Sequence, residues 1–324
     1  MKIQLITEEN FFMSLRGKVK PWQENYLAMY STQWQGYTTD PDLMVIPIDD
    51  HLVHRGDGVF DVMRCVDGKI YQMEQHLQRL KRSAKAISLS PPPEYKNIRE
   101  LIKHLILAAR NKNCLIRIVL SRGPGSFSTN PFDCPSSQMY VNIVRFHRLP
   151  EEYYSTGVTL ITAHIPIKKS FFATIKSCNY LPNVLVKMEA IEAEANYAVA
   201  LDADGYLAEG SIENVAVLTA DGILRFPGFE KTLSGVTANR IFQLAEKLVT
   251  EGVIKDVLFA NILPEEAYRA KEIFLTGTSL NILPVVSYDG NPIGHGIPGP
   301  VYSRLSKLLW EDMTRNTDLL TEIF

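Results

Sequence analysis

The stretch FATIKSCNYLPNVLVKMEA, residues 172–190, guides the reading of the whole chain because it places Lys176 just before an Asn-Tyr-Leu-Pro turn and a helical pattern. A lysine taken alone indicates little, since most lysines are solvated surface charges and are seldom buried without a reason. A chemical role for Lys176 therefore has to come from the residues that surround it.

Length and composition limit the class of protein. The chain has 324 residues, of which 46% are hydrophobic, which allows a sizeable core and favours two domains over one. The 34 basic and 36 acidic residues give a net charge of −2, without a like-charge run or a basic stripe. This balance favours neither a nucleic-acid partner nor a membrane surface. We expect a small molecule or another protein as the partner.

Cysteine spacing and the N-terminus bear on the compartment. The four cysteines are Cys65, Cys114, Cys134 and Cys178. They lack the short paired spacing of a zinc site or a secreted disulfide framework, so we expect reduced thiols and no metal site. Glu8 and Glu9 lie where a signal peptide needs an apolar core, and no apolar run reaches the ~18 residues of a membrane span. The sequence predicts a cytoplasmic protein.

Two α/β halves are predicted: residues 1–146 with a partly helical lead-in, a proline-containing linker at 147–152, and residues 153–324. Period-2, β-branched segments predict strands, and helical spacing predicts the helices between them. The predicted strand segments are 44–50, 58–71, 115–123, 139–146, 157–165, 197–219 and 271–290. The predicted helices are 73–87, 97–112, 184–197 and 237–252. Asp-Gly pairs at 67–68, 204–205 and 221–222 predict hairpin turns.

Lys176 and Glu209 are the first candidate catalytic residues. A lysine that forms a Schiff base must lie in a dry pocket, which lowers its pKa and leaves the amine nucleophilic. Glu209, in LAEGSIENV, follows an apolar strand and precedes a glycine. It is either a strand-end carboxylate in solvent or a carboxylate that keeps a pyridine nitrogen protonated.

Three further segments contain candidate anion ligands. In LSGVTANR (233–240), a Ser-Gly turn opens a helix, so the N–H groups of Val236 and Thr237 suit an anion, although capping also explains the threonine. EQHLQRL (74–80) puts His76 and Arg79 on one helix face, where the arginine either binds phosphate or is solvated. FLTGTSLNILPV (274–285) contains Thr278 in a hydroxyl-rich loop that suits phosphate or forms a plain turn.

The order of these segments resembles the class IV aminotransferases, which are fold-type IV pyridoxal 5′-phosphate enzymes. His-x-x-Arg-Leu, a lysine, Glu-Gly-x-x-x-Asn, Gly-x-Thr and Thr-Gly-Thr follow one another, and the likeness covers about residues 45–310. The resemblance implies that Lys176 holds the cofactor as a Schiff base and acts as acid and base, and that Glu209 partners the pyridine nitrogen. The other cofactor contacts that it implies are Arg79, Tyr180, Val236, Thr237 and Thr278.

The choice of substrate is left open among three activities of this family. VIPIDDHLVHRGDGVFD, KSCNYLPNVLVKMEA and AEGSIENVAV are most similar to D-amino acid transaminases, which ranks a D-amino acid such as D-alanine first. Bacterial members with that activity bind the substrate carboxylate through a tyrosine and Arg-x-His, where this chain has Phe60, Phe127 and Thr129. RGPGSFST, with Phe60 and Arg64, is similar to aminodeoxychorismate lyase, which ranks second. Branched-chain aminotransferase ranks third.

The resemblance also concerns the wider site. The candidate substrate contacts are Phe60, Arg64, Arg122 and Ser279. Arg64 or Arg122 is either the carboxylate anchor or a surface strand charge. The family likeness implies two α/β domains with the cofactor between them, and a homodimer in which each protomer completes its partner's pocket. The presence of both Lys176 and Glu209 favours an enzyme over a cofactor-free binding module.

Overall fold

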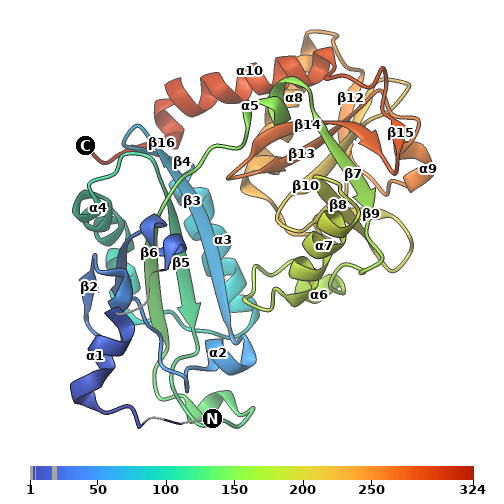
Figure 1. Cartoon of the computed structure of the whole chain (residues 1–324). Coiled ribbons are helices and arrows are strands. Elements are labelled where there is room, and N and C mark those ends of the chain that lie inside the picture. The colour runs from blue at the N-terminus through green and yellow to red at the C-terminus, as the bar shows by residue number, and fades with distance from the viewer. Residues whose placement is uncertain (1–2, 4, 17–19) are drawn as a thin grey trace.

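Two sheets organise the computed structural model, which describes residues 3, 5–16 and 20–324 (Figure 1). The first sheet has seven strands in the order β16-β4-β3-β5-β6-β1-β2, and every pairing in it is antiparallel. Its strands are β1 Tyr26–Ser31, β2 Gly36–Thr38, β3 Gly58–Val66, β4 Lys69–Tyr71, β5 Cys114–Ser121, β6 Gln138–Arg145 and β16 Leu320–Glu322. The helices before β6 are α1 Glu8–Arg16, α2 His51–Arg55, α3 Met73–Ala86 and α4 Ile98–Ala109.

The two faces of the first sheet have different roles because side chains alternate along a strand. On β3, Met63 and Cys65 belong to the apolar core that the sheet forms with residues of α3 and α4. Phe60 and Val62, on the opposite face of the same strand, line a cavity between the two halves of the chain. One face of the first sheet therefore packs into the apolar core, and the opposite face forms one wall of the cavity.

The second sheet is mixed, in the order β12-β11-β10-β13-β14-β7-β8-β9, and β15 pairs with β14. Its strands are β7 Val158–Thr162, β8 Tyr197–Leu201, β9 Leu207–Gly210, β10 Asn214–Leu218, β11 Ile223–Phe226, β12 Asp256–Phe259, β13 Glu272–Gly277, β14 Asn281–Tyr288 and β15 Asn291–Pro292. The remaining helices are α5 Glu151–Ser155, α6 Ser170–Ala173, α7 Leu181–Glu192, α8 Val236–Thr250, α9 Pro264–Ala267 and α10 Pro300–Arg315.

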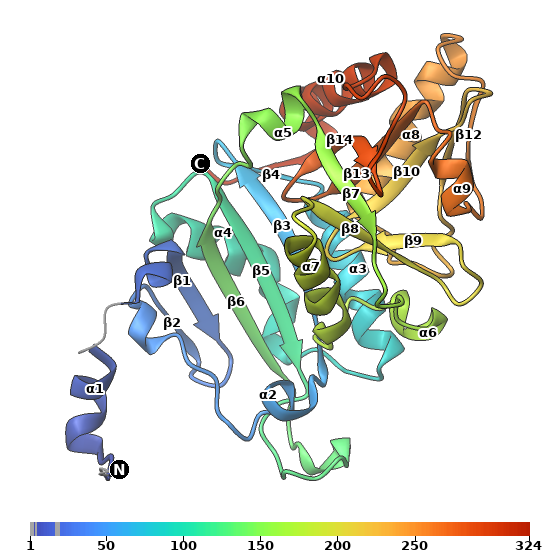
Figure 2. The same ribbon diagram turned by 45° about the vertical axis from the view of Figure 1, so that its right-hand side comes forward.

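Strand β9 pairs with both β8 and β10, so that six strands of the second sheet close into a ring. The closing pair is Glu209 opposite Asn214. Apolar residues of β10 and β13 pack with α8 and α10 on the outside of this ring, where Figure 2 shows both helices. The ring therefore fixes Glu209 at the junction of two strands that face the first half.

Most predicted elements are confirmed. All four predicted helices form, and the Asp-Gly pairs lie in the β3–β4, β8–β9 and β10–β11 turns. The strand predicted at 44–50 is wrong: this segment is a loop with one isolated bridge at Asp50, and it contains Pro47, which has no N–H for a ladder. The lead-in also contains two strands that were not predicted, β1 and β2.

The chain passes from the first sheet to the second between the end of β6 and α5, and it returns at its C-terminus, where β16 pairs with β4. Figure 1 shows this return, with the C-terminus beside the first sheet after α10 has crossed between the halves. Division into domains at 147–152 stays a prediction. Among the residues that the structure describes, no helix combines the length and the apolar character needed to cross a membrane.

Candidate active site

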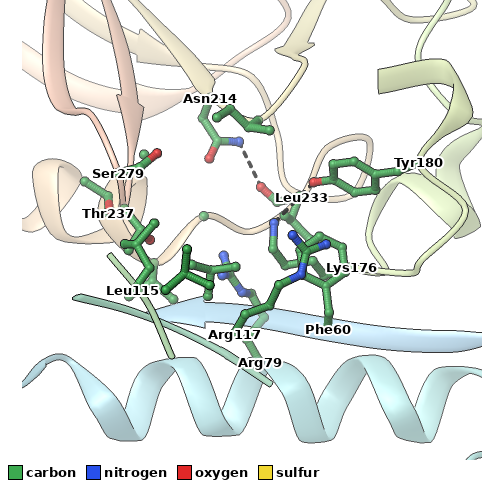
Figure 3. A pocket seen from close by; sticks show the side chains of 17 residues that line it. Phe60, Arg79, Leu115, Arg117, Lys176, Tyr180, Asn214, Leu233, Thr237 and Ser279 are labelled. Carbon is green, nitrogen blue, oxygen red and sulfur yellow. Dashed lines mark hydrogen bonds between the residues drawn. The ribbon is translucent and has the colours of Figure 1, made fainter. Parts of the chain in front are cut away.

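A cavity of about 390 Å³ lies between the two halves and contains most of the predicted site residues. The predicted residues that line it are Phe60, Arg79, Lys176, Tyr180, Val236, Thr237, Thr278 and Ser279. Figure 3 shows that these side chains come from both halves, with β3 and α3 on one side and the second half on the other. Segments separated by more than a hundred positions in the sequence therefore form one site.

Lys176 is held on the edge of β3 by main-chain hydrogen bonds. The Phe60 N–H donates to the Lys176 carbonyl at 2.9 Å, and the Cys178 N–H donates to the Gly58 carbonyl at 2.9 Å. The Lys176 N–H donates to Ser83 Oγ of α3 at 3.2 Å. The segment that contains Lys176 thus forms a single bridge after α6, and this bridge joins the second half to the first sheet.

The amine of Lys176 has the environment of a reactive lysine. The residue is 9% exposed, and Nζ lies 3.4 Å from the Tyr180 hydroxyl and 4.9 Å from the centre of the Phe60 ring. Burial, followed by the charge of Arg79, lowers the pKa of Lys176 to about 7. A substantial fraction of the amine is therefore uncharged near neutral pH, as a nucleophile and proton acceptor requires.

Glu209 is buried behind the cavity wall and is not one of the residues that line it. Its Oε2 accepts a hydrogen bond of 2.9 Å from the Leu233 N–H, and Leu233 does line the cavity. Burial raises the pKa of Glu209, although the Leu233 N–H and the charges of Lys168 and Lys176 oppose the rise. Glu209 is therefore a buried carboxylate without an ion pair among the described residues, and it is suited to a cationic partner.

The phosphate contacts predicted from the sequence meet at one end of the cavity. Helix α8 begins at Val236 after Gly235, and no side chain caps its N-terminus. A Cβ on Gly235 would lie 1.9 Å from Asn214 Oδ1, so glycine allows the close approach of the turn. Backbone N–H groups at this helix start, together with the hydroxyls of Thr237 and Thr278, form an anion-binding set.

Arg79 lines the same cavity but is already paired. Its Nε and Nη2 donate to the two carboxylate oxygens of Asp61 at 2.8 Å each, and His76 Nδ1 lies 2.7 Å from Asp61 Oδ1. Although burial alone would raise the pKa of Asp61, the charges of Arg79 and His76 hold it well below its usual range. The remaining nitrogen, Nη1, is 3.4 Å from the Ser234 carbonyl. Arg79 can therefore offer an anion its outer edge while its inner edge anchors α3 to β3.

The two arginines considered as carboxylate anchors, Arg64 and Arg122, do not line this cavity. Arg122 forms a two-bonded ion pair with Asp57 at 3.0 Å and donates to the carbonyls of Ile87 and Ser88. Arg64 is on the same face of β3 as Phe60 but farther along it, where it donates to Asn281 and lines a different cavity. Arg64 lies too far along β3 to reach the space beside Lys176. The hydrogen bonds of Arg122 are already made to Asp57, Ile87 and Ser88, so it is not free to bind a substrate carboxylate.

Arg117 is the cavity residue that the sequence analysis missed. It lies on β5 opposite Val62, and its guanidinium is 4.6 Å from the centre of the Phe60 ring. No carboxylate pairs with it in the part of the chain that the structure describes. One feature of the sequence could have identified it: Arg117 is the only charged residue of an otherwise apolar strand, and side chains alternate between the two faces of a strand.

The residues of the cavity fit pyridoxal 5′-phosphate. Lys176 provides a buried amine of lowered pKa, and Glu209, directly behind Leu233 of the cavity wall, provides a buried carboxylate without an ion pair among the described residues. The start of α8 provides backbone donors for a phosphate, and Gly235 keeps the approach open. These are the donor types that an aldehyde, a pyridine nitrogen and a phosphate dianion require.

Comparisons with known proteins agree with this geometry. The family described as amino-transferase class IV matches residues 58–288. The chloroplastic D-amino-acid transaminase of Arabidopsis thaliana is 40% identical over 292 residues, 90% of this chain and 77% of that protein. The D-alanine aminotransferase of Bacillus licheniformis is 29% identical over 278 residues, 84% of this chain and 93% of that protein. The crystal structure of the branched-chain amino acid aminotransferase of Escherichia coli superposes with a TM-score of 0.84 at 26% identity and covers 93% of this chain and 99% of that one. The chain therefore belongs to the class IV aminotransferases.

Proposed function

We propose that this pyridoxal 5′-phosphate-dependent transaminase moves the amino group of a D-amino acid, such as D-alanine, to a 2-oxo acid. The observation that carries the proposal is the unpaired Arg117 in the cavity of Lys176. The Arg117 guanidinium and the Lys176 amine lie near the same Phe60 ring, at 4.6 Å and 4.9 Å from its centre. A substrate with its Cα at the lysine thus has its carboxylate within reach of the arginine.

The similarity to D-amino-acid and D-alanine transaminases supports the choice of a D-amino acid over the other substrates of the family. Apolar side chains surround the space beside Arg117, among them Val62, Leu115 and Val144. They suit a substrate with a small apolar side chain, such as that of alanine.

The residues of the chain divide the reaction between them. Bound pyridoxal 5′-phosphate supplies a ring that stabilises negative charge at the substrate Cα. Lys176 Nζ, whose pKa burial lowers to about 7, would attach the cofactor and then accept and return the Cα proton. Glu209, which lies behind Leu233, would hold the ring nitrogen, and Val236, Thr237, Thr278 and Arg79, which line the cavity, would hold the phosphate. Tyr180, whose hydroxyl is 3.4 Å from Nζ, orients the amine and would contact the phenolic oxygen of the cofactor.

The test is a comparison of substrates with the purified holoenzyme. We expect D-alanine with 2-oxoglutarate to give pyruvate and glutamate faster than L-leucine or L-isoleucine gives its oxo acid. Aminodeoxychorismate is the third substrate, and release of pyruvate from it without a 2-oxo acid acceptor is the reaction of the lyase. Preference for an L-branched-chain amino acid or for aminodeoxychorismate contradicts the proposal and leaves the family assignment intact.

We also propose that the enzyme is a homodimer, as the family resemblance implies. Large apolar side chains are exposed on and near the first sheet, including Trp34 at 55%, Tyr37 at 51% and Phe132 at 90%. Exposed aromatic residues of this kind are enriched at protein interfaces. Light scattering of the holoenzyme measures the mass, and a fully active monomer contradicts the shared pocket.

A further inference from the structure

A second cavity, of about 480 Å³, lies where the two halves meet away from Lys176. The end of β3, the short helix α5, the start of β14 and helix α10 surround it, and both ribbon views show these elements together (Figures 1 and 2). The polar and aromatic residues that matter here are Arg64, Arg148, Asn281, Tyr302, Lys307 and Trp310.

Arg64 is a buried cation without a counter-ion. It is 8% exposed, and no carboxylate pairs with it among the described residues. Its Nη1 donates to Asn281 Oδ1 at 2.9 Å, its guanidinium lies 4.0 Å from the centre of the Phe146 ring, and its buried Nε has no acceptor. Buried charges are normally paired because desolvation is costly. Burial accordingly lowers the pKa of Arg64 to about 10.

The charged residues near Arg64 do not neutralise its positive charge. Arg148 is balanced by Glu151, at 3.1 Å. Lys307, on α10, has no carboxylate partner in the part of the chain that the structure describes. The cavity thus has a positive excess from Arg64 and Lys307, and Ser306 also lines it, whereas the Ser303 hydroxyl already donates to the Gly299 carbonyl. A cation-rich cavity with a hydroxyl donor has the chemistry of an anion site.

We propose that this cavity binds a small anion that carries a phosphate or a carboxylate group, at a site separate from the cavity of Lys176. The anion pairs with the Arg64 guanidinium and Lys307 Nζ. It therefore also lies against Asn281, the first residue of β14, which has a positive φ of 62° and follows the Thr278–Ser279 turn. An anion bound in this cavity is thus close to the Thr278–Ser279 turn, whose hydroxyls line the active cavity. This position makes the anion site suited to regulation of the enzyme.

Calorimetric titration of the holoenzyme, whose cofactor-phosphate site is filled, tests the proposal. The probes are inorganic phosphate and malonate, titrated separately so that a phosphate site and a carboxylate site are distinguished. We expect saturable binding of at least one of them, at one site per chain. Arg64→Met should abolish it, and Lys307→Gln should weaken it about ten-fold, as expected for one charged hydrogen bond.

Two control variants show which of the two cavities binds the anion. Arg304→Gln removes a cation of the same helix that pairs with Glu251 instead of lining the cavity, and it should bind like the parent protein. Arg117→Gln removes the unpaired cation of the active cavity and should also keep the binding. No saturable binding of either probe, or parent-like binding by Arg64→Met, overturns the proposal. Loss of binding in Arg117→Gln alone assigns the anion to the active cavity and overturns it as well.

Discussion

The two walls of the active cavity are built from different kinds of structure. The wall from the first sheet consists of regular strands, whose hydrogen bonds are used within the ladder, so it presents side chains such as Phe60 and Arg117. The wall from the second half consists of a bridge at Lys176, the turn before α8 and the β13–β14 turn, where backbone donors are available. The second half is therefore suited to hold the cofactor, and the first sheet to select the substrate.

Lys176→Ala is the strongest test of the second-half wall. Loss of one group that is both covalent ligand and proton acceptor should lower turnover by about 10²–10⁴-fold or more. Borohydride should no longer fix the cofactor to the protein, which mass spectrometry measures. Lys169→Ala, at a neighbouring exposed lysine, is the control and should react normally. Near-parent turnover of the Lys176 variant without added amine rules out the assignment.

Glu209→Gln should lower kcat by up to about a hundred-fold with little change in KM, because a neutral amide loses one charge-assisted contact to the ring nitrogen. Steady-state kinetics of the reconstituted enzyme provide the measurement. Glu213→Gln is the matched control: Glu213 is also buried, burial raises its pKa to about 7, and its carboxylate accepts from the Ile212 N–H instead of the Leu233 N–H. Equal losses in the two variants would indicate a packing effect instead of a catalytic one.

Arg117→Gln tests the first-sheet wall and should separate substrate binding from cofactor binding. We expect kcat/KM for the amino acid to fall about ten-fold, the effect of one charged hydrogen bond to a carboxylate. Cofactor retention during dialysis should stay at the parent level. Arg122→Gln is the contrast, since it should lower the melting temperature through the lost Asp57 pair and leave kcat/KM within about two-fold. An unchanged kcat/KM in Arg117→Gln leaves the carboxylate without its proposed anchor.

The same contrast explains what the sequence could predict. Local signals were sufficient for α3, α8, the three Asp-Gly turns and the glycine before α8, because each depends on neighbouring residues. The positions of Arg64 and Arg122 outside the cavity could not be predicted, because charge and position on a strand do not reveal the partners of a side chain. Asp57 is 65 positions from Arg122, and Asn281 is 217 positions from Arg64. Arg117 was missed for the converse reason, since its lack of a partner is visible only when the sheet is assembled.

The pKa of Lys176 predicts how cofactor attachment depends on pH. Because burial and Arg79 lower this pKa to about 7, the reactive uncharged amine is lost as pH falls through 7. Attachment of pyridoxal 5′-phosphate to the apoenzyme, followed by absorbance, should therefore be about ten-fold slower at pH 6 than at pH 8. The folded apoenzyme also binds fewer protons than the unfolded chain between about pH 7 and 10.5, so this lysine should make stability rise with pH across that window. A midpoint of attachment near pH 10 would place the amine in solvent.

Arg79→Lys should have the smallest effect, because the substituted residue keeps a positive charge at the same place in the cavity. An ammonium preserves a positive charge beside Asp61 but cannot bridge both carboxylate oxygens and still extend a nitrogen toward a phosphate. We expect the cofactor to dissociate a few-fold faster during dialysis, with kcat restored by excess cofactor. Arg79→Ala is a harsher change, since it leaves Asp61 buried with only His76 and the Val62 N–H as partners, and it should lower the melting temperature as well. If Arg79→Lys loses stability but retains cofactor like the parent, Arg79 serves only to join α3 to β3, and the phosphate depends on α8 and the β13–β14 turn.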